Sequence, residues 1–569
     1  MRRSMRVAAL GAVGLLAVSL GAVTALRGAA PAAAATTSGG VKIAYFTQWG
    51  IYQNLYYPKN MDTQGVASKL NFVEYAFENI DPTNKTCFET TAAASQDENN
   101  PNAGDGAGDS FADYGKSYTA DIAVNGQADV FNQPIVGNFN QLKELKAKYP
   151  NLKILVSIGG WTYSKYFSDV AATDASRKKF VSSCIDMFIK GNLPVQNGYG
   201  GAGTGAGIFD GVDIDWEYPG AAGHLGNHFT SADTANYTLL LKEFRTELDA
   251  LGGAHRYLTA AVPAGQDKIS HIQTNQVAPY LDYANVMSYD MHGGFEPTGP
   301  ANLQDPLYTS PSDPMTPIPP GSGKYSIDAA MKAWTAGDSP YGIPGGFPAN
   351  KLTIGYPLYY RGWTGVAAGS KHGLYQPASA PAPGHTLSGN VAGVSFYKEL
   401  SGIVDNPADT YFDPTAQGAY FYSGNTLWTG DSAQSIQAKA NYQHCNGYAG
   451  SMIYSLEADS NSTLFNQIVN ATNGSATNCT GAPPTTPPTT APTTSPTTPP
   501  TTPPTTKPTT PPTTKPTTAP PSAPAWAPNT AYTVGQLVSY AGRTYKCLQS
   551  HTSLTGWEPP NVPALWQPV

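Results

Sequence analysis

The sequence has few of the residues from which redox centres, metal sites and nucleic-acid interfaces are built. Its 569 residues include only five cysteines, and no two of these form a CxxC pair, so we expect no zinc or redox site and no cofactor. Basic residues are also scarce, since 33 Lys and Arg face 40 Asp and Glu. The resulting net charge of −7 argues against nucleic acid or an anionic membrane as a partner.

Long apolar runs are absent except at the N-terminus, where Val7 to Leu26 follows a basic start and precedes the small residues Ala32 to Ala35. This order is typical of a secretory signal peptide. Residues 1–35 are therefore expected to be removed, leaving a secreted, extracellular protein without membrane contact. An N-terminal membrane anchor is the alternative, and a monomer is the default expectation.

The five cysteines are Cys87, Cys184, Cys445, Cys479 and Cys547. In a secreted chain they permit two disulfides and leave at least one cysteine outside a bridge. Cys445 with Cys479 is a plausible pair.

The pattern on which the remaining interpretation depends lies in residues 208–217. Asp213, Asp215 and Glu217 alternate with apolar residues, which is the period-2 signature of a strand. Neighbouring carboxylates would then lie about 6.6 Å apart along one face, and their repulsion in a buried site favours protonation of at least one. A carboxyl that keeps its proton near neutral pH is what general acid catalysis requires. Asp210 has the opposite parity and is expected to face the helices or cap the strand.

Two alternatives for this segment are a solvated acidic edge strand and a hard-cation site. Both fit poorly, because Val212, Ile214 and Trp216 would fill the other face of the strand and the acids lack the loop spacing of a calcium motif.

Strand-like and helical segments alternate along the chain. Strands are expected at residues 41–46, 70–77, 152–160, 208–217, 257–263, 284–290, 352–358 and 451–455, with helices including 141–148, 175–190 and 237–251. This alternation predicts an α/β fold, a (β/α)8 TIM barrel with its site at the carboxyl ends of the strands.

The spacing Asp210-x-x-Asp213-x-Asp215-x-Glu217 resembles the DxxDxDxE signature of family 18 glycoside hydrolases, the chitinase family. The resemblance covers about residues 41–470 and includes an SxGG match that ends at Gly160 and an MxYD match that ends at Asp290. It implies hydrolysis of β-1,4-N-acetylglucosamine linkages in chitin with retention of configuration. The sugar's own N-acetyl oxygen would attack the anomeric carbon and form an oxazolinium ion.

The resemblance also implies a role for each site residue. Glu217 would act as general acid and then as base, Asp215 would orient the acetamido group, and Asp213 would share a proton with Asp215. Tyr289 would donate a hydrogen bond to the acetamido carbonyl and Asp290 would hold the distorted sugar. The expected substrate-binding residues are Trp49, Gly160, Trp161, Met287, Phe295, Tyr359, Arg361 and Tyr454.

One position departs from the family pattern. The family places a Trp on the eighth strand beneath the distorted sugar, and Tyr454 stands there. The smaller ring is expected to weaken stacking by about 1 kcal/mol, unless a one-residue misalignment hides the true counterpart.

Three further parts complete the expected organisation. Within a catalytic region of residues 41–478, residues 360–430 are expected to form a small α+β insertion domain like that of the deep-cleft chitinases. Residues 482–524 consist almost only of Thr and Pro and are expected to be a disordered linker.

Residues 525–569 resemble the small all-β chitin-binding modules of carbohydrate-binding families 5 and 12. Flat aromatic rings bind sugar faces, so Trp557, together with Trp566 and Tyr532, is expected to contact chitin. Trp526 and Tyr545 are expected to lie in the core of the module.

Two other functions stay open at this point. One is a noncatalytic chitin-binding lectin on the same barrel, and the other is an endo-β-N-acetylglucosaminidase that acts on N-glycans. The presence of Glu217 with both aspartates favours the enzyme over the lectin, and the terminal module favours a polymer with a surface as substrate.

Overall fold

The computed structural model describes residues 39–95, 97, 99–476, 479, 523–548, 550–553, 558–560, 562 and 565–568. The expected signal peptide and nearly all of the expected linker lie outside these residues. The chain divides into two compact units, residues 1–485 and 486–569, which are described separately. No helix in the described ranges is both long enough and apolar enough to cross a membrane.

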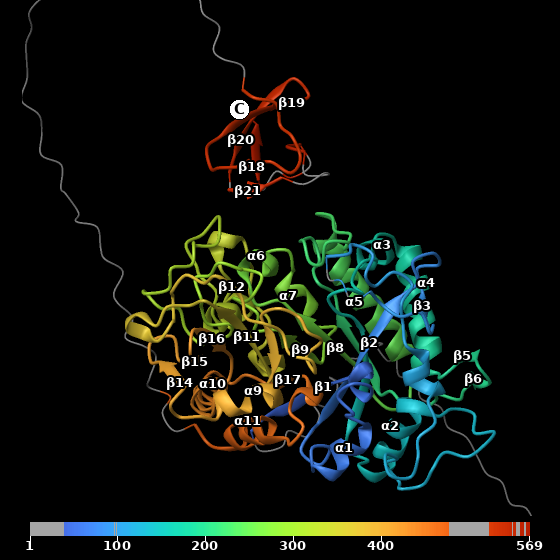
Figure 1. Ribbon diagram of the computed structural model, residues 1–569. Coiled ribbons are helices and arrows are strands. Elements are labelled where there is room, and N and C mark those ends of the chain that lie inside the picture. Colours follow the sequence, from blue (N-terminus) through green and yellow to red (C-terminus); the bar gives the residue numbers. More distant parts are fainter. Residues whose placement is uncertain are drawn as a thin grey trace, which may run out of the picture. The chain divides into compact units, whose positions relative to one another are not determined.

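Eight parallel strands form the centre of the first unit (Figure 1). They are β1 Val41–Thr47, β2 Phe72–Ile80, β4 Lys153–Gly159, β7 Gly211–Asp215, β8 Tyr257–Val262, β9 Tyr283–Val286, β10 Leu352–Pro357 and β17 Gly450–Tyr454. Strand β1 pairs with both β2 and β17, which closes the sheet into a barrel, and the short β3 Cys87–Phe88 pairs antiparallel with β2. The predicted (β/α)8 barrel is confirmed, and each strand overlaps its predicted range.

Helices connect these strands and surround the barrel (Figure 1). They are α1 Pro58–Thr63, α2 Gly137–Lys148, α3 Phe167–Ala171, α4 Asp174–Cys184, α5 Asp233–Ala250, α6 Gln266–Ile269, α7 Thr274–Val277, α8 Ile327–Thr335, α10 Ala433–Asn446 and α11 Thr463–Asn473. Short 3-10 or π turns are η1 Gln48–Ile51, η2 Phe111–Gly115, η3 Ile185–Ile189, η4 Ser339–Tyr341, η5 Ala349–Lys351, η6 Gly369–Lys371 and η7 Leu456–Ala458, and β5 Leu193–Gln196 pairs with β6 Tyr199–Gly201.

The interior of the barrel is layered. Near the amino ends of the strands, Phe72 meets Tyr257 and Tyr283 edge-on, with ring centroids 4.9 and 5.6 Å apart, and these rings fill the barrel. The next layer includes the polar side chains of Glu74, Asp213 and Thr259, beside apolar ones such as Leu155 and Met452. The apolar plug closes the amino end of the barrel, so a site within the barrel has to lie toward the carboxyl ends of the strands.

An antiparallel sheet lies between β10 and β17 in sequence, where the insertion domain was predicted. Its strands are β11 Tyr359–Thr364, β12 Ala380–Pro381, β13 Val394–Phe396, β14 Thr410–Asp413, β15 Gly418–Ser423 and β16 Thr426–Thr429, with α9 Tyr397–Val404 packed against them. Strand β11 follows β10 after a single residue, Leu358, so the insertion begins at the carboxyl end of a barrel strand.

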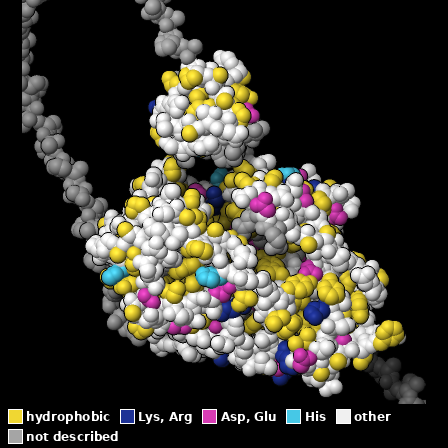
Figure 2. All heavy atoms as spheres, viewed as in Figure 1, with side chains coloured by type: hydrophobic (Ala, Val, Ile, Leu, Met, Phe, Trp, Pro, Cys, Tyr) yellow, Lys and Arg dark blue, Asp and Glu magenta, His cyan; other side chains and the backbone are white. Residues whose placement is uncertain are grey.

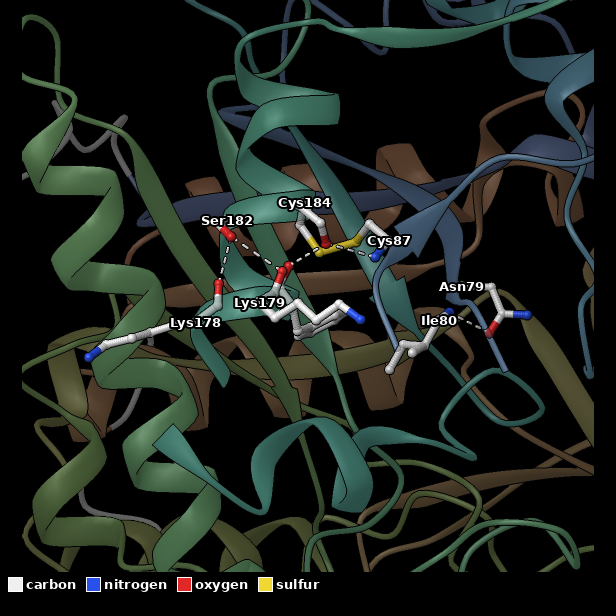
Figure 3. Close-up of a disulfide and its surroundings, with 9 residues drawn as sticks. Asn79, Ile80, Cys87, Lys178, Lys179, Ser182 and Cys184 are labelled. Carbon is white, nitrogen blue, oxygen red and sulfur yellow. Dashed lines mark hydrogen bonds between the residues drawn. A yellow bond between two sulfur atoms is a disulfide. The ribbon is translucent and has the colours of Figure 1, made fainter. Parts of the chain in front are cut away.

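Two disulfides join distant segments of the first unit. Cys87 bonds to Cys184, which ties β3 to the end of α4 (Figure 3), and Cys445 bonds to Cys479, as predicted. The sulfur of Cys547 is in neither bridge and is buried in the second unit.

The second unit is a small all-β module. Its strands are β18 Ala531–Tyr532, β19 Leu537–Tyr540, β20 Arg543–Cys547, β21 His551–Thr552 and β22 Trp566–Pro568. Trp526 and Tyr545 lie in its core, as predicted.

Two of the rings expected to contact chitin lie in that same core. Tyr532 and Trp566 are 4% and 1% exposed, and their ring centroids are 5.0 Å apart. Neither ring presents a face to a sugar, so the expectation for these two residues is wrong. The small module has few other large apolar groups, and it uses these rings to fill its own interior. Trp557 lies outside the described residues.

Candidate active site

The acidic row lies where its parity predicts. Asp213 and Asp215 belong to β7 and point into the barrel, whereas Glu217 follows two residues after the strand ends. On the opposite side, Trp216 is 2% exposed and stacks on Phe167 of α3, with ring centroids 5.4 Å apart. The apolar side chains therefore face the helices, and the acids face the interior and the mouth of the barrel.

Asp210 takes the expected structural role. Its carboxylate accepts a hydrogen bond from the backbone N–H of Ile154 at 2.9 Å and forms a 2.9 Å ion pair with Lys146 of α2. It ties the start of β7 to β4 and to the helix layer, away from the interior.

Asp213 is buried beneath the strand ends and is held by three hydroxyl groups. Tyr45 and Ser157 donate to Oδ2 at 2.9 and 2.7 Å, and Thr259 donates to Oδ1 at 2.6 Å. Burial raises the pKa of Asp213, and the three hydroxyl groups oppose that rise by stabilising the carboxylate. Three donors make Asp213 the member of the row best suited to carry the negative charge.

Asp215 has the opposite environment. It is 3% exposed, and its Oδ1 atom has no hydrogen-bond partner. Burial, with the negative charges of Glu217 and Asp213, raises its pKa well above the usual range. These environments favour the proton on Asp215 over Asp213, and the sharing of a proton between the two stays a prediction.

Glu217 lies at the end of the row. Burial raises the pKa of Glu217 to about 7, with Asp290 adding to the rise and the Tyr218 hydroxyl opposing it. Its backbone is fixed, because Ser164 accepts from its N–H at 2.9 Å and Asn227 donates to its carbonyl at 2.8 Å. A carboxyl group that is half-protonated near neutral pH can both donate a proton and take one back.

Strand β9 and the insertion contribute the other side of the site. Asp290 follows β9 and accepts hydrogen bonds from the Tyr359 hydroxyl and from Arg361 Nε, both at 2.7 Å. Burial and the charge of Asp215 keep the pKa of Tyr289 well above its usual range, so its hydroxyl stays a donor. That hydroxyl lies 3.6 Å from the sulfur of Met452, which is only a weak acceptor.

Aromatic rings surround this polar centre. Tyr454 lies against Tyr45 and Phe77, with ring centroids 5.5 and 6.4 Å apart, and also borders Tyr289 and Tyr359. Met287 packs on the same cluster. Tyr454 therefore lies among the aromatic side chains at the carboxyl end of the barrel, and its place beneath a bound sugar stays a prediction.

Three large rings remain exposed among the expected substrate-binding residues. Trp49, Trp161 and Phe295 are 40%, 43% and 60% exposed. Trp49 packs against Phe77, and Phe295 lies 5.8 Å from the guanidinium of Arg361. Figure 2 shows hydrophobic side chains in a hollow of the first unit, on the face that is in view. Such rings are suited to stack on a bound sugar.

Gly160 serves packing in this structure. Its φ of +84° lies in the left-handed region, and a Cβ there would come within 2.9 Å of the Phe77 ring. The glycine allows Phe77 to support Trp49 and Tyr454 from below. This is a structural reason for the residue in addition to the expected approach of a ligand.

Several residues that build the site were not singled out from the sequence. They are Tyr45, Glu74, Ser157, Thr259 and Tyr218. Strand parity gives a signal for the first four. Each lies two residues from an interior apolar side chain of the same strand, and these side chains are Ile43, Phe72, Leu155 and Tyr257. Tyr218 gives no such signal.

A closed (β/α)8 barrel with a titratable acid at the end of one strand and exposed aromatic rings around it has the parts that a barrel glycosidase needs. Comparison with known proteins narrows the class. The family model described as glycosyl hydrolases family 18 matches residues 41–459, and the chain belongs to that family. Carbohydrate-binding module family 5/12 matches residues 525–567.

Individual relatives agree with this assignment. Chitinase C of Streptomyces lividans is 36% identical over 428 residues, which is 74% of this chain and 58% of that protein. Chitinase A1 of Niallia circulans is 33% identical over 75% of this chain and 57% of that protein. The catalytic domain of chitinase B from Arthrobacter TAD20 superposes with a TM-score of 0.70 at 39% identity, over 77% of this chain and 96% of that domain. The match thus spans less than two thirds of each of the two curated relatives.

Proposed function

We propose that this protein is a chitinase that hydrolyses β-1,4-N-acetylglucosamine linkages with retention of configuration. The observation that carries the proposal is Glu217, whose pKa is raised to about 7 at the mouth of the barrel, directly above the buried Asp213 and Asp215. Family membership and the names of the matched relatives support chitin as substrate.

The reaction would proceed in two steps. In the first, Glu217 donates its proton to the glycosidic oxygen while the acetamido oxygen of the substrate attacks the anomeric carbon, which breaks the glycosidic bond and forms an oxazolinium ion. In the second, the Glu217 carboxylate takes a proton from water, whose oxygen attacks the same carbon and reopens the ring. Two inversions at one carbon give net retention.

The neighbouring side chains would control the acetamido group. Asp215, protonated or sharing a proton, would hold the acetamido nitrogen and balance the charge of the oxazolinium ion as its own proton moves toward Asp213. Tyr289 would donate its hydroxyl hydrogen to the acetamido oxygen. Asp290, fixed by Tyr359 and Arg361, would accept from a sugar hydroxyl group and hold the distorted ring.

Trp49, Trp161 and Phe295 would bind successive sugars by stacking, each contributing about 1 kcal/mol. The C-terminal module would hold the protein on the chitin surface and raise the local substrate concentration. With the expected signal peptide, this organisation fits a secreted protein that degrades an extracellular polymer and needs no cofactor.

The test is release of soluble sugar from colloidal chitin by the full chain, by Glu217→Gln and by a matched control, Glu243→Gln, on the outer helix α5. Glu217→Gln should lose between ~10² and ~10⁴ in rate and still bind chitin, because the amide cannot donate a proton as an acid. The control should keep full activity. Proton NMR of the first product should show the β-anomer, and an inverted α-anomer would contradict the substrate-assisted route.

The same assays separate the alternatives. Binding of chitin without hydrolysis by the unmodified protein would identify a lectin. Release of glycans from an N-glycoprotein at a higher rate than sugar from chitin would identify an endo-β-N-acetylglucosaminidase.

A further inference from the structure

A second group of buried acids lies outside the site described above, at the end of β2. Glu78 belongs to β2, Glu89 follows β3, and Asp113 lies in η2. They are 3%, 8% and 0% exposed, and one carboxylate oxygen from each lies within 4.8 Å of the others. Three segments that are separate in sequence therefore bring three carboxyl groups together at one buried position.

Few groups of the protein compensate these acids. Asp113 accepts hydrogen bonds from Gln48 Nε2 at 3.0 and 3.2 Å and from the Tyr75 hydroxyl. Glu89 and Asp113 also form a hydrogen bond between their carboxyl groups, which requires a proton on one of them, and the Oε1 atom of Glu78 is buried without a hydrogen-bond partner. None of the ion pairs found within the described ranges includes Glu78, Glu89 or Asp113.

Three carboxylates in a low-dielectric interior repel one another strongly, so protons or a cation must neutralise them. A set of oxygen ligands made only of carboxylates suits a hard cation, and two oxygens on one Ca²⁺ ion lie at most about 5 Å apart. The separation of these oxygens meets that limit, and the buried, unpartnered Oε1 atom of Glu78 points to a ligand that the side chains themselves do not supply.

We propose that Glu78, Glu89 and Asp113 bind one hard divalent cation, for which Ca²⁺ is the probe. The cation would anchor the long segment between β2 and α2, because Glu89 and Asp113 both belong to that segment. The Cys87–Cys184 disulfide already ties the same segment to α4 (Figure 3). Since Gln48 hydrogen-bonds Asp113 and precedes Trp49, the site would also stabilise the turn that presents Trp49.

Protons compete with the cation. Burial raises the pKa of Asp113 to about 8 and those of Glu78 and Glu89 well above the usual range. Binding should therefore release protons, and Ca²⁺ affinity should increase from pH 6 to pH 8.

The test uses the full chain after chelation and desalting, with Ca²⁺ titration by calorimetry and thermal unfolding with and without Ca²⁺. We expect one Ca²⁺ per chain, at least a tenfold loss of affinity in Glu89→Gln, no loss in the control Glu243→Gln, and a Ca²⁺-dependent rise in Tm that Glu89→Gln lacks. Absence of both Ca²⁺ binding and a Tm shift in the unmodified chain would overturn the proposal and leave shared protons as the explanation. Proton release by the unmodified chain tests the site even if Glu89→Gln fails to fold.

A different observation, one hydroxyl group inside the barrel, carries a second inference. Thr259 Oγ1 lies 2.6 Å from Asp213 Oδ1 and 3.1 Å from Glu74 Oε1. A hydroxyl group has one hydrogen, so it can donate to only one of the two carboxyl groups. Asp213 also accepts from Tyr45 and Ser157, which identifies Asp213 as the acceptor.

The contact between Glu74 and Thr259 then needs a hydrogen from Glu74. We infer that Glu74 is a neutral carboxylic acid that donates to Thr259 and so directs the Thr259 hydroxyl toward Asp213. Glu74 is 0% exposed, and the titratable groups that face it are Asp213 on β7 and Tyr45 on β1. Burial and the charge of Asp213 raise its pKa well above the usual range. Glu74 is a positioning residue, because it acts through Thr259.

The test compares Glu74→Gln, whose amide can still donate to Thr259, with Glu74→Leu, which cannot. The first readout rests on the proposed function. The pH profile of kcat/KM should be unchanged in Glu74→Gln and shifted in Glu74→Leu. A shift of the Gln profile toward lower pH would show that Glu74 carries a charge and would overturn the inference. Infrared absorption of a protonated carboxyl group, lost in Glu74→Gln, tests the same point even if chitin is not the substrate.

Discussion

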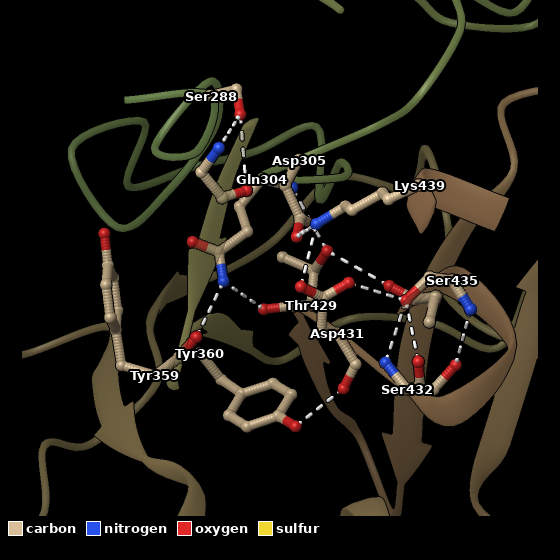
Figure 4. A network of polar contacts seen from close by, with 12 residues as sticks. Ser288, Gln304, Asp305, Tyr359, Tyr360, Thr429, Asp431, Ser432, Ser435 and Lys439 are labelled. Carbon is tan, nitrogen blue, oxygen red and sulfur yellow. Dashed lines mark hydrogen bonds and ion pairs between the residues drawn. The ribbon is translucent and has the colours of Figure 1, made fainter. Parts of the chain in front are cut away.

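Two buried acidic clusters in the first unit differ in how their charge is balanced. In the barrel, Asp213, Asp215 and Glu217 are surrounded by hydroxyl groups and aromatic rings. Beside the insertion, Asp305 and Asp431 hold the fully buried ammonium of Lys439 between them, at 2.6 and 2.8 Å (Figure 4). The Tyr360 hydroxyl also donates to the Asp431 carbonyl, whereas Tyr359 points away from this network toward Asp290 (Figure 4).

This difference in charge balance matches a difference in role, which is structural for the Lys439 cluster and proposed to be catalytic for the barrel acids. Burial disfavours the charge of Lys439, but Asp305 and Asp431 outweigh it and raise its pKa, so the pair of acids keeps a permanent cation. Even so, burial raises the pKa of Asp305 to about 6. The barrel acids have only hydroxyl groups and protons to balance their charge, and the pKa of Glu217 is raised to about 7. A cation would fix the charge of the barrel row and remove its capacity for acid catalysis.

The largest expected effect comes from removing the cation. Lys439→Met should lower the free energy of unfolding by about 3–5 kcal/mol, because it leaves the carboxylates of Asp305 and Asp431 buried without a counter-charge. Urea denaturation of the full chain measures this loss. The triple variant Lys439→Met with Asp305→Asn and Asp431→Asn should recover most of it, and a triple variant as unstable as the single one would show that packing of the Lys439 stem, not charge, is responsible.

The second-largest expected effect is the loss of folding stability that the charge of Glu217 causes at high pH. The pKa of Glu217 is about 7 in the folded chain and about 4.3 in an unfolded one, so the folded state binds more protons between these values and its stability falls as pH rises through that window. Glu217→Gln does not titrate. It should equal the unmodified protein in stability at pH 4 and exceed it by about 2 kcal/mol at pH 8. Equal stabilities at pH 8 would contradict the raised pKa.

A smaller effect tests how the insertion tunes the acid. The negative charge of Asp290 raises the pKa of Glu217, and Arg361 balances Asp290. Asp290→Asn should move the alkaline limb of the kcat/KM profile downward by up to about one pH unit, and Arg361→Met should move it upward. Movement of both limbs in the same direction would show that the two variants act through geometry.

The smallest effect involves no charge and so isolates stacking from electrostatics. Tyr454→Trp restores the ring that the family pattern carries and should lower KM for chito-oligosaccharides about fivefold, equivalent to about 1 kcal/mol. Tyr454→Phe keeps the ring size and serves as control. A Trp variant with lower kcat and lower Tm would show that Tyr45, Phe77, Tyr289 and Tyr359 leave no room for the indole.

Much of the site was readable because strand parity is a local property. The alternation of Asp213, Asp215 and Glu217 with apolar residues placed the acids on one face. The opposite parity of Asp210 predicted that it faces the helices or caps the strand, and the structure pairs it with Lys146. The barrel was predicted from a different pattern, the alternation of eight strand-like segments with helices, whereas the apolar plug was not predicted.

Other features depended on segments far apart in sequence. Glu74 and Thr259 are 185 residues apart, and only the closed barrel brings them to one hydrogen bond. Five cysteines allowed several pairings, and the position of α4 beside β3 selected Cys87 with Cys184. The roles of Tyr532 and Trp566 could not be assigned from the sequence, because Tyr and Trp serve both to fill a small core and to stack on a sugar.

The sequence by itself determined the barrel, the acid row and the family, since these follow from periodicity and spacing along single strands. The tertiary structure alone decided which acid keeps a proton. That outcome depends on whether a hydroxyl group, an ammonium group or another carboxylate from a distant segment lies within about 3 Å, and on the low dielectric of the interior that they share.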